Sequence, residues 1–527
     1  MWYNKNVYSQ KGLDKMARFK AAAVFSDHMV LQRNKNISVF GIGDDGRKVT
    51  VSLGGNIAHA DVINGKWTVI LPPMAAADGL EMRISDGDSE IVFTDIAVGE
   101  VWLAGGQSNM ELELQNCENG RSELDRIAEN PDYVNVRFYY TEKYPCVDDE
   151  LIEKESHKCW SRPDKENSRY WSAVGYFFGK KLSEDLGVTV GVIGCNWGGT
   201  SASAWISKER LAEDKDTNEY NIDYDKAMDG KTYEQYLDDL AEYRRWEADW
   251  TPKMQQMYID NPNTKWEDVI AALGPNRYPE PLGPRSPFRA GGLYESMIKR
   301  VAPYTLAGFI YYQGESDDHR PNSYYKLMKM LVEQWRTDWQ DDTLPVIMVQ
   351  LPMFCYEGED RRTNWSIIRE AQTRVFRTVK NTGMAVISEF GEHNNIHPVK
   401  KEPVGERLAM QAEWIAYGML SEGEACAPMY ESHTYKNGGI SCRIAHCGSG
   451  LHIVGNKDDI LVEIAGEDRK FVPADKLEVS GSTLFAAASS VDAPRYLRYE
   501  FANHCEVKIF GGNGMPLAPF RTSYDDE

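Results

Sequence analysis

The chain has 527 residues, more than one hydrophobic core usually accommodates, so we expect about two to four domains. Apolar residues make up 42% of the composition, as in globular proteins, and no apolar run approaches the roughly 20 residues that a membrane-spanning helix needs. The formal net charge of −21 argues against nucleic acid or an anionic membrane as a partner, because phosphate binding requires clustered Lys and Arg.

The first residues and the cysteines bear on the compartment. The start contains basic residues but lacks the continuous apolar segment of a signal peptide, which predicts a cytoplasmic location. Nine scattered cysteines, an odd number, suit reduced thiols. Cys442, His446 and Cys447 have no second matching pair, so we interpret them as ordinary strand residues rather than as a zinc site.

Residues 1–19 are interpreted as an N-terminal extension, and residues 20–97 have the pattern of short strands. Apolar and polar residues alternate in segments that end in Gly, Pro or Asp: 36–43, 48–55, 66–73 and 81–87. This alternation predicts a small antiparallel β domain of sandwich type.

Residues 98–424 have a different pattern. Continuous apolar runs, typical of strands buried on both faces, occur at 96–106, 188–199, 304–316, 344–352 and 383–392. Helical patterns separate them, as at 172–187 and 366–383. The alternation predicts a parallel α/β sheet that binds its ligand at the carboxyl ends of the strands.

Two further segments complete the predicted organisation. Residues from about 208 to 273 are polar and helical, which indicates an insertion that shapes a substrate lip. The proline-rich segment 274–288 is either an ordered loop at the edge of the site or a plain connector. Short strands return over 425–527 and predict a second antiparallel β domain.

Ser108 follows the apolar run 98–104 and the turn Gly105–Gly106. A strand, a turn and a helix in this order would hold its hydroxyl at the rim of the sheet, beside a helix N-terminus. A helix N-cap is the alternative role for this serine. The segment is not a G-x-S-x-G elbow, since Met110 stands where that motif has its second glycine.

Polar residues follow three other predicted strands. They are Gly198, Gly199 and Thr200 after the second run, Gln313 and Glu315 after the third, and His397 on a loop before a helix. A serine, a glycine N–H, an amide and a histidine at one rim provide a nucleophile, a base and oxyanion donors. This combination predicts acyl transfer.

These segments resemble the sialate O-acetylesterase family, carbohydrate acetylesterases within the SGNH (GDSL-like) hydrolases. The resemblance extends from end to end, over residues 25–41, 99–111, 196–205, 291–298, 309–317, 396–409, 463–474 and 514–522. It implies an SGNH-hydrolase (flavodoxin-like) domain flanked by the two β domains. It also implies Ser108 as the nucleophile, His397 as the general base, and no metal or organic cofactor.

The oxyanion hole that the resemblance implies consists of the Ser108 N–H, the Gly199 N–H (with Gly198 as the fallback) and the Gln313 side-chain amide. The triad acid is open, because Asn394 and Asn395 stand where many relatives carry aspartate. Glu315 is the first candidate, Glu392 the second and a backbone carbonyl the third; Asn394 and Asn395 are further alternatives. Glu315 is equally well explained as a loop-fixing partner of an arginine. His393 and His397 are unsuited to sharing a metal, because Pro398 disfavours helix at His397.

The resemblance predicts a serine esterase that removes O-acetyl groups from carbohydrate, with sialic acid esters favoured. Acetylated xylan or xyloglucan oligosaccharides are the alternative substrates, and a catalytically impaired carbohydrate-binding protein is a further alternative. A sialate carboxylate would need a cation, for which Arg277, Arg285 and Arg289 are candidates. A neutral glycan would instead use aromatic residues such as Trp197, Trp205 and Tyr278. The oligomeric state, a homo-oligomer included, is left open.

Overall fold

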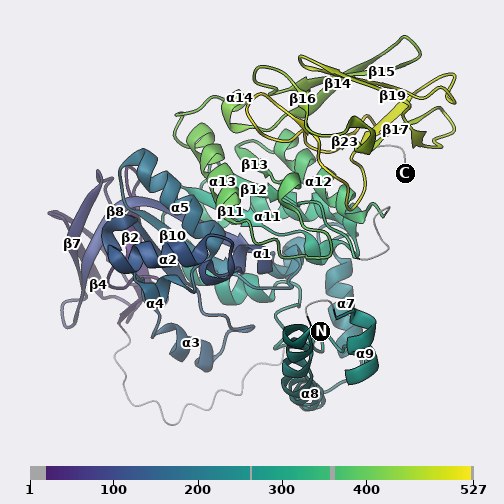
Figure 1. The fold of residues 1–527 in the computed structure, drawn as a ribbon. Helices are drawn as coiled ribbons and strands as arrows, with labels where there is room; N and C mark the ends of the chain where they lie inside the picture. Colours follow the sequence, from purple (N-terminus) through teal and green to yellow (C-terminus); the bar gives the residue numbers. More distant parts are fainter. Residues whose placement is uncertain (1–18, 262–263, 357–361, 524–527) are drawn as a thin grey trace.

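The computed structural model describes residues 19–261, 264–356 and 362–523 (Figure 1). It is a mixed α/β structure with a central mixed sheet and antiparallel β sheets at both ends of the chain. In these ranges no helix combines the length and the apolar character that crossing a membrane requires.

The N-terminal region forms short strands, as predicted. β1 (Lys20–Ala21), β3 (Ile37–Ile42) and β6 (Lys66–Leu71) make one antiparallel sheet. The antiparallel partners in a second layer are β4 (Lys48–Leu53), β5 (Asn56–Asp61) and β7 (Ala77–Ser85). Buried and exposed residues alternate strictly along β6, so every second residue of this strand belongs to its buried face.

The 17-residue strand β8 (Glu90–Gly106) joins the N-terminal region to the central sheet. Its first half pairs with β7 and with β2 (Val30–Gln32), and its second half lies in the parallel sheet. The predicted domain boundary at residue 97/98 therefore falls inside one continuous strand, and the N-terminal sheet and the central sheet form a single ten-stranded sheet.

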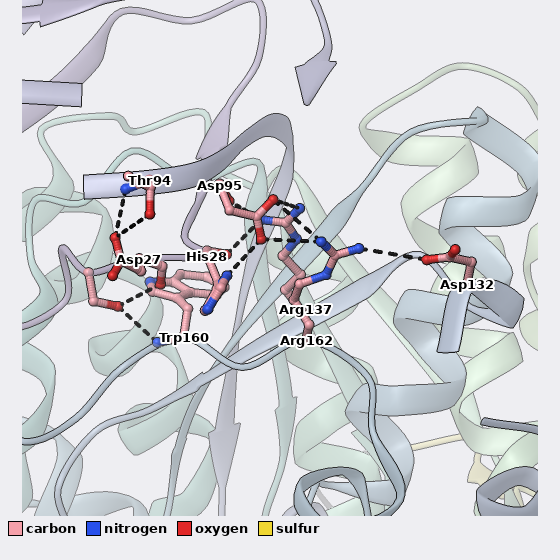
Figure 2. Close-up of polar contacts among 9 residues, drawn as sticks. Asp27, His28, Thr94, Asp95, Asp132, Arg137, Trp160 and Arg162 are labelled. Carbon is pink, nitrogen blue, oxygen red and sulfur yellow. Dashed lines mark hydrogen bonds and ion pairs between the residues drawn. The ribbon is translucent and has the colours of Figure 1, made fainter. Parts of the chain in front are cut away.

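A polar network around Asp95 reinforces this junction, as Figure 2 shows. Asp95 Oδ2 lies 2.6 Å from His28 Nδ1, and Arg137 Nη1 donates to His28 O at 3.0 Å. Arg162 pairs with the same carboxylate at 3.3 Å. The network connects the N-terminal region to strand β9 (Val136–Tyr140) of the central sheet.

The parallel part of the sheet has the strand order β9-β10-β8-β11-β12-β13. The bounds are β9 (Val136–Tyr140), β10 (Val190–Asn196), β11 (Gly308–Tyr312), β12 (Val346–Gln350) and β13 (Thr382–Val386). Every residue of β10 to β13 is buried, which confirms the prediction from the apolar runs. Without β9, which was not predicted, the order is that of a doubly wound sheet whose ligand crevice lies between β8 and β11.

Helices cover the sheet in two contacting pairs, α5 (Ala173–Leu186) with α13 (Glu402–Ile415) and α11 (Tyr324–Trp339) with α12 (Asn364–Thr378). α5 shows how the sequence sets a helix. The hydroxyl of Ser172 accepts from the Gly175 N–H at its start, and Gly187 ends it with a φ of 64°. Shorter helices are α1 (Ser108–Glu111), α2 (Gly120–Glu129), α3 (Asp149–Glu155), α4 (Lys165–Ser168), α10 (Lys299–Val301) and α14 (Glu422–Ala425).

The segment predicted as a helical insertion is helical. It contains α6 (Lys208–Leu211), α7 (Glu219–Met228), α8 (Tyr233–Asp260) and α9 (Trp266–Leu273). Thr232 and Gln235 form a capping box at the start of α8, and Trp250 packs against Trp266 of α9. In Figure 1, α7, α8 and α9 lie together below the central sheet.

The C-terminal region forms antiparallel sheets with a hydrophobic core of their own, which includes Ile440, Leu484 and Leu497. One sheet contains β14 (Met429–Lys436), β15 (Gly439–Ala445), β20 (Thr483–Ala487) and β19 (Lys476–Ser480). Another contains β18 (Val472–Pro473), β17 (Val462–Ala465), β21 (Tyr496–Tyr499) and β23 (Phe520–Arg521), and β16 (His452–Ile453) pairs with β22 (Ile509–Phe510).

Candidate active site

Ser108 lies where the central strand β8 ends. Gly106 has a φ of +136°, and a Cβ there would lie 2.1 Å from Tyr312 O of the neighbouring strand, so the turn requires glycine. The chain then enters the single turn of α1, with Ser108 as its first residue. The predicted strand, turn and helix around this serine are confirmed.

The Ser108 hydroxyl lies against the His397 imidazole, with 2.8 Å between Oγ and Nε2. His397 belongs to the loop between β13 and α13, which two side chains hold in place. Asn395 Oδ1 accepts from the His397 N–H at 3.1 Å, and Asn109 Nδ2 donates to Ile396 O at 2.9 Å. Two segments that are almost 300 residues apart thus place a hydroxyl and an imidazole in hydrogen-bond contact.

A buried polar trio lies directly behind this pair. Asn109, the residue after the serine, donates to Glu315 Oε1 at 2.5 Å and accepts from Lys401 Nζ at 2.6 Å. All three side chains are buried. Since the amide of Asn109 also holds the His397 loop, the trio couples the nucleophile turn, the loop after β11 and the start of α13.

Burial shifts the ionisation of these groups. Desolvation lowers the pKa of Lys401 to about 7, against the effect of the Glu315 carboxylate. Desolvation also raises the pKa of Glu315, and the hydrogen bond from Asn109 opposes that change. The pKa of His397 is lowered, first by desolvation and second by the charge of Lys401. The imidazole is therefore kept neutral, the form that accepts a proton from a hydroxyl.

The structure does not place any of the predicted triad acids against the His397 ring. Glu315 bonds to Asn109, and Glu392 accepts from Asn395 Nδ2 at 2.7 Å and from the Val399 N–H at 2.9 Å. Asn395 contacts the backbone of His397, and Asn394, at a φ of 61°, donates its N–H to Cys355 O. In the part of the chain that the structure describes, His397 Nδ1 has no hydrogen-bond partner.

Glu111, which the sequence analysis did not select, is the carboxylate that acts on His397. It opposes the lowering of the His397 pKa through space. Its Oε2 accepts from the Gly198 N–H at 2.6 Å, and Lys143 pairs with its other oxygen. The fallback oxyanion donor, Gly198, is therefore engaged by a carboxylate.

Gln313 departs from its predicted role. Its side chain is buried, and Nε2 donates to Asp317 Oδ2 at 2.7 Å, with Gln107 Oε1 and Thr200 O at 3.2 and 3.3 Å. Both amide hydrogens are therefore engaged within the loop. Asp317 also accepts from the Ala202 N–H at 2.9 Å, so Gln313 belongs to a network that fixes the glycine turn. In this arrangement the Gln313 amide donates within the loop and not toward the serine.

The remaining predicted donors lie beside the serine. A Cβ on Gly198 would be 3.4 Å from Ser108 Cβ, and Gly199 follows with a φ of +74°. Tyr278 covers Gly199 so closely that a Cβ there would lie 2.0 Å from its hydroxyl. Among the described residues, the N–H groups of Ser108 and Gly199 donate to no acceptor, which leaves both available to an oxyanion.

Two cavities adjoin the glycine turn, and Tyr278 lines both of them. The cavity of 350 Å³ is lined by Gly199, Tyr220, Tyr278, Phe288, His319 and Arg320, among others. The cavity of 530 Å³ is lined by Lys143, Trp197, Gly198, Arg244, Tyr278 and Arg285, among others. The predicted substrate residues Trp197, Tyr278 and Arg285 thus share one cavity, to which α8 of the insertion contributes Arg244.

The other candidate residues lie elsewhere or have partners. Arg285 pairs with Asp148 at 3.3 Å and Glu150 at 3.5 Å. Arg277 pairs with Glu242 at 3.0 Å, and Arg289 donates to Pro145 O at 3.2 Å. Trp205 is fully buried.

Comparison with known proteins finds carbohydrate esterases. The family profile described as carbohydrate esterase, sialic acid-specific acetylesterase, matches residues 284–412. The sialate O-acetylesterase of Mus musculus is 27% identical over 438 residues, covering 76% of this chain and 74% of the relative. That of Pongo abelii is 26% identical over 568 residues, covering 97% and 93%. Over most of its length the chain is therefore similar to sialate O-acetylesterases.

The fold is similar to that of a carbohydrate acetylesterase of known structure, which agrees with a carboxylic ester hydrolase. The crystal structure of a carbohydrate acetylesterase from Xanthomonas citri superimposes with a TM-score of 0.73 at 26% identity. The match covers 96% of this chain and 99% of that one, so it includes both β regions and the insertion.

Three residues of the site were missed by the sequence analysis: Asn109, Glu111 and Lys401. All three lie inside the segments that carry the family resemblance, within four residues of Ser108 or His397. That proximity was the available signal, but it does not reveal which side chains turn inward.

Proposed function

We propose that this chain is a serine esterase of the SGNH type that removes O-acetyl groups from carbohydrate. The observation that carries the proposal is the 2.8 Å contact between Ser108 Oγ and His397 Nε2 at the carboxyl edge of the sheet. A hydroxyl in contact with a neutral imidazole is the arrangement that makes serine a nucleophile. The similarity to sialate O-acetylesterases indicates acetyl as the acyl group and a sugar hydroxyl as the alcohol.

The reaction follows from this geometry in two steps. Ser108 Oγ attacks the acetyl carbonyl while His397 Nε2 takes its proton, and the sugar oxygen then leaves with that proton. Water next attacks the acetyl-serine with His397 again as the base, and acetate is released. The N–H groups of Ser108 and Gly199 receive the oxyanion in each tetrahedral intermediate.

The pair acts without a carboxylate on the imidazole. His397 Nδ1 carries the proton when Nε2 accepts from serine, and Asn395 and Asn109 fix the loop rather than the ring. The imidazolium that forms during the attack is stabilised by the Glu111 carboxylate. This compensation is weaker than that of a triad aspartate, because the Glu111 carboxylate also pairs with Lys143 and does not contact the imidazole.

Acetylated sialic acid is the substrate that we propose first. Its carboxylate requires a cation in the cavity beside Gly198, and Arg285 there already has two acidic partners. Arg244, an exposed side chain that lines the same cavity, is the cation that we assign to this role. An acetylated neutral oligosaccharide is the second candidate, because Trp197 and Tyr278 line that cavity and provide aromatic surface.

The proposal is tested by the release of acetate from two substrate sets in parallel, O-acetylated sialic acids and acetylated xylo-oligosaccharides, with Ser108→Ala as the control. We expect acetate from the wild type and a loss of at least about 10³-fold in the variant. Binding of an acetylated sugar without acetate release between about pH 6 and 9, where the histidine is neutral, would instead support the carbohydrate-binding alternative. The ratio of the rates of acetate release from the two substrate sets shows which class of sugar the enzyme prefers.

A further inference from the structure

The geometry points to a second site, in which Cys355, His393 and His504 bind a divalent transition metal, with zinc as the most suitable ion. The thiol sulfur and one nitrogen of each imidazole lie within 4.8 Å of one another. The residues come from the segment after β12, the loop before His397 and the connection between β21 and β22. Three distant parts of the chain thus bring together a set of ligands that zinc prefers.

A buried arginine fixes two of these segments side by side. Arg369 of α12 donates to Pro352 O at 3.1 Å and to Asn503 O at 3.4 Å. The Phe354 N–H donates to Asn503 O at 3.0 Å. Phe354 and Asn503 directly precede the cysteine and one of the histidines. The backbone on both sides of the site is therefore set by the fold, before any ion binds.

The third segment is tied to the first. The Asn394 N–H donates to Cys355 O at 3.3 Å. Gly391 lies so close to Met353 that a Cβ on it would be 2.0 Å from Met353 O. The ring centroids of the two histidines are 4.9 Å apart, with the rings nearly perpendicular at 78°. The three ligand side chains therefore extend from backbone segments that are hydrogen-bonded to, or packed against, one another.

The donor set suits zinc in number and kind. Zinc bonds of about 2.0–2.3 Å place tetrahedral ligand atoms about 3.3–3.6 Å apart, so the separations between the ligand atoms have to shorten by at most about 1.5 Å. His393 is exposed and His504 is half-buried, whereas the thiol of Cys355 is buried, so solvent reaches the cluster from the side of the two imidazoles. On binding, the thiol loses its proton to solvent, and a water molecule completes the coordination.

An ion at this site would fix the loop that carries the catalytic base. His393 lies four residues before His397, and its neighbours Glu392 and Asn395, one on each side of it in the sequence, form an antiparallel backbone bridge. The sequence analysis weighed His393 with His397 as a metal pair, whereas in the structure His393 lies beside His504 of the C-terminal region. The ion would clamp that region to the His397 loop without contacting the reacting atoms.

The site is tested with the full-length chain, treated with a chelator, kept reduced and titrated with Co²⁺ as a spectroscopic substitute for zinc. We expect one equivalent of Co²⁺ per chain, with the visible bands of tetrahedral cobalt and a thiolate-to-cobalt charge-transfer band. Zn²⁺ should displace the bound Co²⁺ and abolish these bands. Binding without the charge-transfer band would overturn the assignment of Cys355, and no saturable binding would overturn the site.

Variants locate the ion. Cys355→Ser and His504→Ala should each weaken Co²⁺ binding at least about tenfold. Cys505→Ser is the matched control, since it removes a neighbouring thiol outside the cluster, and it should leave both bands unchanged. If Cys355→Ser does not fold, the half-buried His504→Ala decides alone: unchanged bands in that variant would contradict the proposal.

Discussion

Lys401 Nζ donates to Asn109 Oδ1 at 2.6 Å, so a buried ammonium is bonded to the residue that follows the nucleophile. The same charge lowers the pKa of His397. The buried ammonium therefore affects the pH at which the base becomes neutral.

Lys401→Met should move the acid limb of the pH profile upward. In the wild type, the pKa of His397 is lowered from its usual value of 6.5, so kcat/KM should be half-maximal below pH 6.5. Lys401 is protonated in that range because its pKa is about 7. Removing the ammonium removes its repulsion of the imidazolium, and the midpoint rises.

The control for this variant is the adjacent exposed residue, in Lys400→Met. It removes the same charge from the surface and should leave the midpoint where it is. Equal midpoints in Lys401→Met and the wild type would show that the buried lysine is only structural.

Glu315→Gln separates a positioning role from that of a triad acid. Because the Glu315 carboxylate bonds to Asn109 and not to His397, we expect kcat/KM to stay within about tenfold of the wild type. The free energy of unfolding should fall by about 1–3 kcal/mol, since the Asn109 amide loses a charged acceptor. Urea unfolding and ester hydrolysis measure the two effects. A loss of about 10⁴ in kcat would instead identify Glu315 as the triad acid.

Arg244→Ala tests the substrate assignment. A charge-assisted hydrogen bond to a carboxylate contributes about 1.5–3 kcal/mol, so kcat/KM for O-acetylated sialic acid should fall about 10- to 100-fold. Hydrolysis of a neutral acetylated sugar should be unaffected. Arg245→Ala, the exposed neighbour on α8, is the control and should change neither rate. Equal losses on both substrates would argue against carboxylate recognition by Arg244.

Asp95→Asn tests the network of Figure 2. Desolvation opposes ionisation of Asp95, but the hydrogen bond from His28 and the charges of Arg137 and Arg162 prevail and lower its pKa below the usual 3.8. A depressed carboxylate pKa stabilises the fold at every pH above the unfolded value and ceases to do so only as the pH falls through the folded value. The variant should therefore lose about 1–3 kcal/mol at pH 7 and at least as much at pH 5.

Urea unfolding at the two pH values measures this difference. Asp132→Asn is the control, because that side chain is 85% exposed at the edge of the same network, and its loss should be near zero. A difference for Asp95→Asn that disappears between pH 7 and 5 would assign the effect to another group.

The sequence predicted the parallel strands well for a physical reason. Strands buried on both faces appear as continuous apolar runs, and β12 is buried at every residue. Strand β9 was not predicted because it contains Arg137. The guanidinium of Arg137 is buried against backbone oxygens and Asp95 rather than solvated. A charged residue in a short run conceals a strand when its partner lies elsewhere in the chain.

In the candidate site, too, some features could be predicted from the sequence and others could not. Ser108 and His397 were predictable as neighbours because residues after parallel strands meet at one edge of the sheet. The partners of each side chain were not predictable. Gln313 and Glu315 follow the same strand, yet the first bonds to Asp317 and the second to Asn109. Their orientation depends on contacts with loops that the local sequence does not specify.

The central claim, that Ser108 is the nucleophile activated by His397, is tested most directly by covalent labelling. A fluorophosphonate should react with one residue per chain, and peptide mass spectrometry should place the adduct on Ser108 in step with the loss of aryl acetate hydrolysis. His397→Ala should leave the fold intact and slow labelling by about 10³-fold or more. An adduct on another serine with complete loss of activity, or unchanged labelling in His397→Ala, would contradict the account.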